Sequence, residues 1–425
     1  MMALEKFSLG VGDRFGREGQ AQLRALEMAR RMGAQITPVW NKSHREYTLT
    51  GTTPQDMRRR ADRAVRAGGR TDAYYVDADH INMRTVDDYI GPCDFFTIDV
   101  ADLISRPPAV DSATAYLKAI SGLKGELRIP GLRSRLEITE TLLADVALKY
   151  LSAVEEAGRI YRRIAEKKAT TDFVVEVSFD EADVAQTPEE LLLILAAIGR
   201  QGIPIRTIAP KFSGSFLKGV DYVGDPADFG REFEADLAVL NYARPAYGLP
   251  PDLKLSVHSG SDKFSLYPVM HQVIHARDAG LHLKTAGTTW LEEVAGLAAA
   301  GGEGLRLMKE LYAAACERFD ELARPYLAVI AIDRDALPSP KRVSSWDSRE
   351  FVEALEHDPN GERFDRNLRQ LLHISFPVAA EMGERFTDLL DSLRGEIETR
   401  VTNNLLRRHI GPLFLGGPVR AGAAD

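Results

Sequence analysis

Short β-like runs alternate with helical patterns along the first 300 residues, and this alternation limits the possible folds more than any other feature. Eight apolar runs bounded by turn residues predict eight strands, with a helical pattern between most of them. The predicted strands cover residues 6–12, 35–40, 72–77, 94–99, 172–179, 203–210, 253–258 and 281–286. Strand–helix alternation repeated eight times is typical of a (β/α)8 barrel of the TIM type.

The helices between these strands have recognisable ends. One begins after Gly16 and stops at Gly33, a residue type that often terminates helices. In "TPEELLLILAAIGRQG", Thr187 can cap the helix, Pro188 suits its first turn and Glu190 completes a capping box. A doubly wound open sheet is the alternative fold, but "GVGDRFG" lacks the glycine spacing of a dinucleotide-binding turn. The sequence therefore favours the barrel.

Two regions exceed a minimal barrel. The connection at about 100–171, after the fourth strand, is too long for a simple loop and carries a helical pattern over 139–167. Beyond residue 300 the patterns are mainly helical. We expect a barrel domain over 1–300 with that insertion, and a helical C-terminal extension over 301–425 that packs on the barrel and could cover one mouth. The Pro/Gly-rich end, "IGPLFLGGPVRAGAAD", predicts a loose tail.

Charge and cysteine content limit the partners. The formal net charge of −8 disfavours a nucleic-acid partner, although a few local Lys or Arg side chains could still bind a small anion. Cys93 and Cys316 are too few for a disulfide framework or a zinc ribbon. The sequence shows neither a signal peptide nor 18 consecutive apolar residues. We expect a cytoplasmic protein that acts on a small molecule, with its oligomeric state open.

Catalytic residues of such barrels lie at the carboxyl ends of the strands. The stretch "YYVDADHINM" ends the third predicted strand with Asp77, Asp79 and His80. Side chains of a barrel strand alternate between the inside and the outside, and this alternation directs a further set of polar residues inward. That set comprises Glu176, Lys211, His258, His282 and Lys284. Lys211 could serve as a general acid, a carboxylate-binding cation or a Schiff-base lysine.

Three of these strand residues are histidines. His80, His258 and His282, with Glu176 or an aspartate nearby, would suit a divalent ion such as Zn²⁺, Mn²⁺, Ni²⁺ or Fe²⁺. Each histidine alone could equally be a hydrogen-bonded core residue. His373 is expected to be a packing residue, unless the C-terminal segment folds over the barrel mouth.

Two loops offer groups for binding an anion or hydroxyl groups. "HSGSDKF" (258–264) carries Lys263 just before a predicted helix, and "TAGTTW" (285–290) carries Thr288 at a helix start. Free N–H groups at helix starts suit carboxylate or phosphate, although helix capping needs the same residue types. Lys284, near the mouth, could also contact a substrate. Lys263, Lys284 and Thr288 are therefore the candidate substrate-binding residues.

At "VDADHI", "VEVSFDE", "APKFSGSF", "SVHSGSDKFS" and "LKTAGTTW" the chain resembles the tagaturonate epimerase family, and the similarity covers nearly the whole sequence. The resemblance implies a metal-dependent isomerase that interconverts D-tagaturonate and D-fructuronate in hexuronate catabolism. It also implies that Asp79 accepts a proton and that His80 binds the metal, with His258 and His282 as further ligands. The proton donor stays open between Glu176 and Lys211.

Other functions remain compatible with the sequence. One is an aldolase, either metal-dependent or with Lys211 as a Schiff base, and another is an isomerase or epimerase of a related ketose. A non-catalytic binding protein is a third possibility, but such a module has little need for so many inward ionisable groups.

Overall fold

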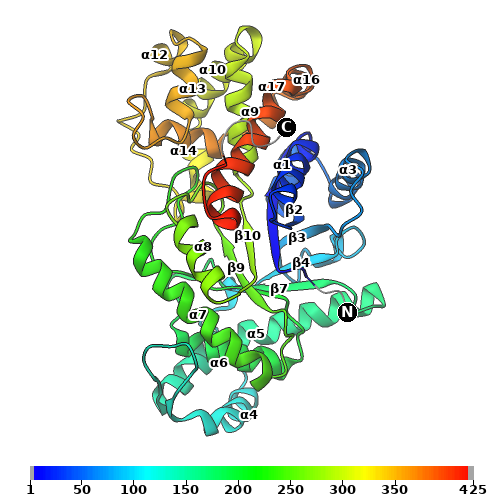
Figure 1. Cartoon of the computed structure of the whole chain (residues 1–425), viewed down its shortest axis with the longest axis vertical. Coiled ribbons are helices and arrows are strands. Elements are labelled where there is room, and N and C mark those ends of the chain that lie inside the picture. The colour runs from blue at the N-terminus through cyan, green and yellow to red at the C-terminus, as the bar shows by residue number, and fades with distance from the viewer. Residues whose placement is uncertain (1–3, 420–425) are drawn as a thin grey trace.

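The computed structural model describes residues 4–419, and its centre is a closed barrel of eight parallel strands in the order β1-β10-β9-β8-β7-β4-β3-β2 (Figure 1). The barrel strands are β1 (Phe7–Gly12), β2 (Thr37–Ser43), β3 (Tyr75–Ile81), β4 (Phe95–Asp99), β7 (Val174–Ser178), β8 (Thr207–Ala209), β9 (Lys254–His258) and β10 (Leu281–Lys284). The predicted (β/α)8 barrel is confirmed. An open sheet is excluded because β1 pairs with both β2 and β10.

Helices surround the barrel. They are α1 (Gly19–Arg31), α2 (His44–Thr50), α3 (Pro54–Ala67), α5 (Glu140–Lys168), α6 (Pro188–Gln201), α7 (Pro226–Ala246), α8 (Tyr267–Ala276) and α9 (Thr288–Ala299). The short turns η1 (Val86–Asp88) and η2 (Ala101–Leu103) flank β4. The capping box of Thr187 and Glu190 forms as predicted. Within residues 4–419, no helix is long and apolar enough to cross a membrane.

Two strands extend further than the sequence predicted. β2 ends at Ser43 rather than residue 40, and β3 ends at Ile81 rather than residue 77. Pairing continues past the apolar runs, with Ser43 opposite Asp79, because the inside of the barrel becomes polar near the mouth. A register shift in β3 follows Ala78, and His80 takes a left-handed backbone conformation there, with φ of 53°.

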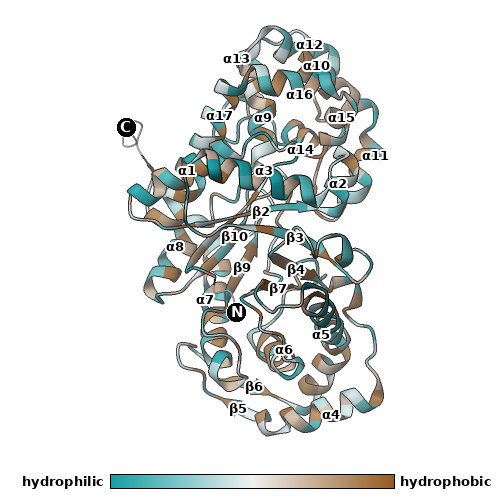
Figure 2. Cartoon of the chain, turned by 90° about the vertical axis from the view of Figure 1, so that its right-hand side faces the viewer, coloured by the Kyte–Doolittle hydropathy of each residue, from teal (hydrophilic) through white to brown (hydrophobic). Residues whose placement is uncertain are grey.

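The inside of the barrel is layered. Leu4, Val39, Tyr75, Phe95 and Val174 form an apolar cluster separate from the main core. The next inward residues toward the carboxyl ends are ionisable or hydroxylic, and the outward residues pack under the helices in the main core. β4 and β7 accordingly appear brown in Figure 2. The alternation predicted for the strands is confirmed, and it directs the ionisable groups toward one mouth.

The insertion after the fourth strand lies at the end of the molecule opposite the C-terminal helices (Figure 1). It contains α4 (Val110–Ile120), η3 (Ser121–Leu123) and the antiparallel pair β5 (Gly125–Leu127) and β6 (Leu136–Ile138). The helix predicted over 139–167 is α5, which packs against α4 and α6. The expected insertion and C-terminal helices are therefore present. The division into domains 1–300 and 301–425 stays a prediction.

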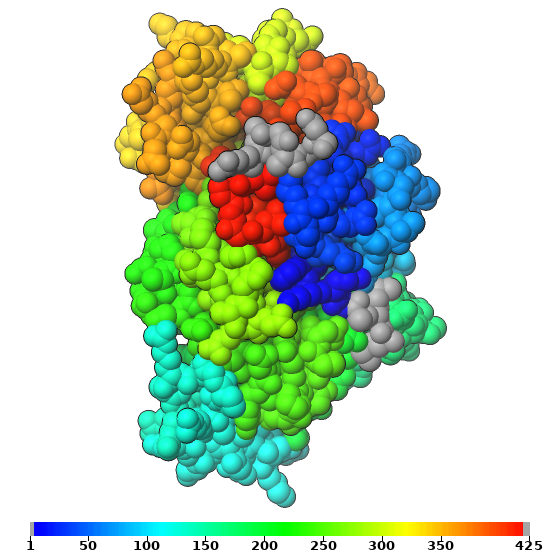
Figure 3. All heavy atoms as spheres, in the orientation of Figure 1, coloured from blue at the N-terminus to red at the C-terminus, as the bar shows by residue number. Residues whose placement is uncertain are grey.

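The C-terminal extension is helical. Its elements are α10 (Gly302–Glu317), α11 (Phe319–Ala323), η4 (Arg324–Tyr326), α12 (Pro340–Ser344), α13 (Ser348–Leu355), α14 (Arg366–Ile374), α15 (Phe376–Glu381), α16 (Glu384–Ser392), α17 (Arg394–Asn403) and the π-helical η5 (Asn404–Leu415). α10, α13, α14 and α17 all contact α9. In Figure 3, η5 (red) fills the space between α1 (blue) and α8 (yellow-green).

The prediction of a loose tail from residue 410 is wrong for its first part. Ile410, Leu413 and Phe414 are buried, because η5 packs its apolar residues against α1 and α8. The last residues of the predicted tail, 420–425, lie outside the described part of the chain.

A buried ionic cluster ties the extension to the barrel. The Asp262 carboxylate, in the loop after β9, accepts hydrogen bonds from Arg369 of α14 at 2.5 Å and from Thr288 of α9 at 3.2 Å. It also lies 3.2 Å from Nδ1 of His357. Burial raises the pKa of Asp262, but Arg369 and the neighbouring histidines outweigh it and hold the pKa well below its usual range. This charged carboxylate joins three separate segments.

Asp262→Asn should lower the free energy of unfolding by about 3–5 kcal/mol, because the buried Arg369 guanidinium loses its counter-ion. Urea denaturation followed by circular dichroism measures the change. Asp278→Asn is the matched control, since Asp278 pairs with Lys6 at the surface and should matter little. An unchanged unfolding midpoint for Asp262→Asn would contradict the role of this cluster.

Candidate active site

A buried lysine lies at the centre of the polar mouth. Nζ of Lys284, at the end of β10, lies 2.7 Å from Asp77, 2.9 Å from Asp79 and 3.3 Å from Glu176. It also donates to the Thr97 hydroxyl at 2.6 Å. These partners come from β3, β4 and β7, so one ammonium group connects four strands across the barrel. Isolated buried charges are costly, and this mutual pairing makes the arrangement possible.

The ion cluster sets the protonation of its members. Burial disfavours the charged form of Lys284, but Asp77, Asp79 and Glu176 outweigh it and hold the pKa of Lys284 well above its usual range. Burial raises the pKa of Asp77 to about 7, against the attraction of Lys284. Burial also acts on Asp79, yet Lys284 and His80 hold the pKa of Asp79 well below its usual range. Asp79 is therefore a charged carboxylate at the mouth.

Beside this lysine, three side chains converge in an arrangement that fits a metal ion. Single ligand atoms of His80, Asp180 and His258 all lie within 4.8 Å of one another. Nδ1 of His258 lies 2.9 Å from the Asp180 carboxylate. The other ring nitrogen of His258 lies 2.7 Å from Glu176, and Nδ1 of His80 lies 3.0 Å from Asp79.

His80 and His258 show the usual pattern around a metal, in which a carboxylate contacts the ring nitrogen of each ligating imidazole that does not bind the ion. Two nitrogens and one carboxylate oxygen suit a borderline divalent ion of the kind expected from the sequence. His80 also belongs to a second group that could hold an ion, with Asp99 and Glu181.

Sequence reasoning missed two members of this site. Asp180 lies just beyond β7, and Thr97 points inward from β4, where its hydroxyl donates to Asp77 and lies 3.3 Å from Glu176. Both residues have a signal in the sequence. Asp180 is an acid directly after a strand, in "VEVSFDE", and Thr97 has inward parity in "DFFTID".

The other predicted residues lie in different environments. His282 is fully buried below Lys284, and its Nδ1 lies 2.9 Å from the Ser8 hydroxyl. Burial lowers the pKa of His282 to about 3. It lies outside the group of His80, Asp180 and His258, so its role as a ligand stays a prediction that the geometry does not favour.

Lys263 and Thr288 are buried away from the ion cluster. Nζ of Lys263 donates to the carbonyl groups of Leu217 and Val220, and Thr288 donates to Asp262. Both residues thus support loops, and substrate contact by either stays a prediction. Lys211 is half-buried at the end of β8, where its main chain bonds to Gln186. Its role as proton donor also stays a prediction.

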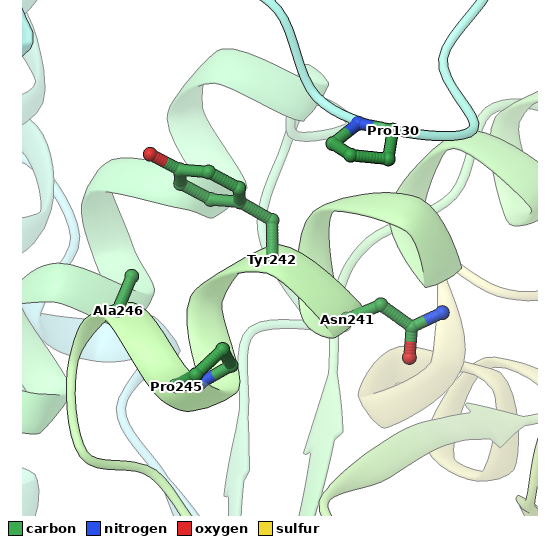
Figure 4. A pocket seen from close by; sticks show the side chains of 5 residues that line it. All are labelled: Pro130, Asn241, Tyr242, Pro245 and Ala246. Atoms are coloured by element: carbon green, nitrogen blue, oxygen red, sulfur yellow. The ribbon is translucent and has the colours of Figure 1, made fainter.

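A separate groove lies near the C-terminal end of α7 (Figure 4). It is lined by Pro130, Asn241, Tyr242, Pro245 and Ala246. The end of α7 leads to the start of β9, so this groove lies at the barrel end opposite the ion cluster. Because the chemistry of TIM barrels takes place at the carboxyl ends of the strands, the groove is not the candidate active site.

A closed (β/α)8 barrel with these paired charges at its catalytic mouth defines a TIM-barrel enzyme. The family model of tagaturonate epimerases matches residues 1–409, and the chain belongs to that family. It is therefore an isomerase, as the sequence motifs implied.

Individual relatives agree with this assignment. The chain is 29% identical, over 95% of its length and 80% of the relative, to a tagaturonate/fructuronate epimerase of Thermotoga maritima. Its fold matches the native crystal structure of a fructuronate-tagaturonate epimerase from Cohnella laeviribosi, with a TM-score of 0.78 and 23% identity. That match covers 97% of this chain and 82% of the other, and a glycerol complex of the same enzyme gives a TM-score of 0.79. At this identity the likeness supports the fold.

Lys284→Met should destabilise the protein by about 3–5 kcal/mol, because three buried carboxylates lose their shared counter-ion. Adding Asp77→Asn should then cost less than it does in the wild-type background, since one of the uncompensated carboxylates is removed. Urea denaturation of the four proteins gives the coupling energy. Strictly additive changes would contradict the interdependence of these charges.

Proposed function

We propose that this enzyme interconverts D-tagaturonate and D-fructuronate by inverting C4, with a divalent metal bound by His80, Asp180 and His258. The observation that carries the proposal is the convergence of these three side chains beside Asp79, at the mouth of a barrel of the tagaturonate epimerase family. The substrate named for the Thermotoga relative supports the same reaction. A small sugar-acid substrate and a cytoplasmic location fit a family of metabolic isomerases.

The position of C4 limits the mechanism. In such a keto acid, C4 is adjacent to neither the ketone nor the carboxylate, so its hydrogen is not acidic. Cleavage between C3 and C4 avoids this difficulty: the C4 hydroxyl loses its proton, C4 becomes an aldehyde, and the electron pair forms an enediolate at C2–C3. Rotation of the aldehyde fragment and re-addition to its other face give the epimer, and the proton returns to the C4 oxygen.

The residues of the mouth have distinct tasks in this scheme. Asp79 accepts the proton of the C4 hydroxyl and later returns it, and Lys284 and His80 keep its carboxylate in place. A divalent ion held by His80, Asp180 and His258 would supply a Lewis acid. Glu176 and Lys211 are the candidates for the opposing acid. Burial raises the pKa of Glu176, but Lys284 and His258 outweigh it and hold the pKa well below its usual range, which favours Lys211 as the acid.

A Schiff-base aldolase is less compatible with the site. Lys284 is held in its charged form by three carboxylates and is a poor nucleophile. Lys211 remains a candidate for an aldolase. Borohydride reduction in the presence of substrate distinguishes these functions, since the epimerase should form no covalent adduct. A metal-dependent aldolase would release fragments, and an isomerase of a related ketose would prefer a neutral sugar.

Asp79→Asn should lower kcat at least about 100-fold without loss of bound metal, because the base is removed while the amide oxygen can still accept the hydrogen bond from His80 and the ligands stay. NMR detection of D-fructuronate formed from D-tagaturonate measures activity, and elemental analysis measures the metal. Asp102→Asn, on an exposed position after β4, is the matched control. Full activity of Asp79→Asn would refute this role.

Metal removal tests the ligand set. Chelation with EDTA should abolish activity, and a divalent ion should restore it. Asp180→Asn should weaken metal affinity at least about 10-fold, since one charged ligand is lost. Asp183→Asn, exposed in the same loop, should retain wild-type affinity. Equal metal affinity of Asp180→Asn and the wild type would refute the assignment of this ligand.

A further inference from the structure

The mouth of the barrel raises an electrostatic problem for a sugar acid. Asp77, Asp79, Glu176 and Asp180 all gather around the ion cluster. The Lys284 ammonium is already shared among three of them. His80, His258 and a divalent ion would pair with the remaining acids, so the carboxylate of an anionic substrate needs a cation that is not already engaged.

Lys218 is a cation that is not paired with these carboxylates. It is half-buried in the loop after β8, and its ammonium group makes no hydrogen bond or ion pair with any residue among 4–419. Its Nζ lies close to Gly260, only 3.5 Å from the position that a Cβ atom on that glycine would take. Gly260 comes two residues after the metal-type ligand His258. Lys218 therefore projects toward the mouth without a protein partner.

The main chain around this lysine is rigidly held. The neighbouring carbonyl groups of Leu217 and Val220 accept hydrogen bonds from the buried ammonium of Lys263, at 3.0 and 2.9 Å. The next residue, Gly219, accepts from Arg369 at 2.6 Å and donates to the Ser261 hydroxyl at 3.0 Å. The N–H group of Lys218 itself donates to Val329 of the extension.

A lysine that only faces solvent needs no such network of hydrogen bonds around its main chain. The network is the arrangement expected of a preorganised binding group, whose supporting contacts fix its position before the ligand binds. Lys263, which the sequence predicted to bind the substrate, thus holds the loop that carries Lys218.

A second unpaired group lies beside it. His373 of α14 is 2% exposed, and neither of its ring nitrogens has a hydrogen-bond partner among the described residues. Its Nε2 approaches Gly287 so closely that a Cβ atom there would lie 2.1 Å away. Burial, with the charges of Arg14 and Lys218, holds the pKa of His373 well below its usual range. A neutral imidazole can donate one hydrogen bond to an anion.

Both groups lie next to the catalytic side of the mouth. Cβ of His373 lies 3.3 Å from the position that a Cβ atom on Gly219, the residue after Lys218, would take. Burial raises the pKa of Glu181, and the positive charges of His80 and Lys218 oppose that change, so Lys218 is also near the acidic loop after β7. Gly287 comes three residues after Lys284. The extension therefore places His373 at the mouth. The sequence predicted a functional role for this histidine only if the C-terminal segment folds over the mouth.

We propose that Lys218, with His373 beside it, binds the carboxylate of the sugar-acid substrate. The proposal rests on the proposed function and deepens it. In the cleavage scheme the carboxylate belongs to the C4–C6 aldehyde fragment, so this contact holds the fragment at one end while C4 rotates. The subsite thus explains both selection of an acid over a neutral ketose and retention of the intermediate.

Steady-state kinetics test the substrate contact. Lys218→Met should raise KM for D-tagaturonate about 10- to 100-fold, the usual effect of losing a hydrogen bond to a charged group. It should also release dihydroxyacetone, the C1–C3 fragment, because the partner fragment escapes. His373→Phe, which keeps the ring volume, should act in the same direction, and Lys218→Arg should retain most of the affinity. Lys118→Met, exposed on α4, is the control for simple charge loss.

A binding measurement separates this proposal from the proposed function. Calorimetric titration with D-galactonate and galactitol, an unreactive acid and its neutral counterpart, needs no turnover. The wild type should prefer the acid, and Lys218→Met should lose that preference. A retained preference overturns the subsite even where the wild type is an active epimerase, as does a wild type that prefers neither ligand. A preference that depends on Lys218 in a protein inactive on D-tagaturonate would overturn only the epimerase reaction.

Discussion

The buried ammonium of Lys284 is the interaction on which the arrangement of the mouth depends. It neutralises carboxylates from two strands, and a third strand contributes the Thr97 hydroxyl. Uncompensated charges at this depth would unfold the barrel or take up protons. The register of the strands is therefore fixed by electrostatics as well as by the apolar cluster beneath. The same pairing keeps Asp79 charged beside His80, so structural stability and chemical function use the same contacts.

Sequence patterns predicted much of the fold because barrel strands carry a local signal. The eight runs and their alternation follow from the burial of each strand on both faces, a property of a few consecutive residues. The ends of β2 and β3 were harder to predict, since their last residues are polar but still paired. A pattern based on hydrophobicity stops where a catalytic mouth begins. Such errors therefore concentrate at the residues that matter most for function.

The site was less predictable, because its geometry depends on depth and on distant contacts. Alternation shows that His282 points inward, but not that it lies beneath Lys284 and against Ser8. The loop of Lys263 has the residue types of an anion-binding loop, but the Lys263 ammonium donates to main-chain carbonyl groups in the structure, and its contact with a substrate stays a prediction. Its true partners come from a segment about 45 residues away, as its hydrogen bonds show. No local pattern can separate a supporting lysine from a binding one.

The contacts between the C-terminal extension and the loop of Lys218 give the extension a functional role. A barrel mouth rich in carboxylates suits metal and proton transfer, but its cations are already paired and leave none for an acidic substrate. A cation placed among those carboxylates would simply pair with them, as Lys284 does. The loop of Lys218 differs, because Arg369 and Val329, both from the extension, hold its main chain and the Lys218 ammonium forms no ion pair with any described residue. The helices beyond the barrel thus help to keep one cation available for the substrate.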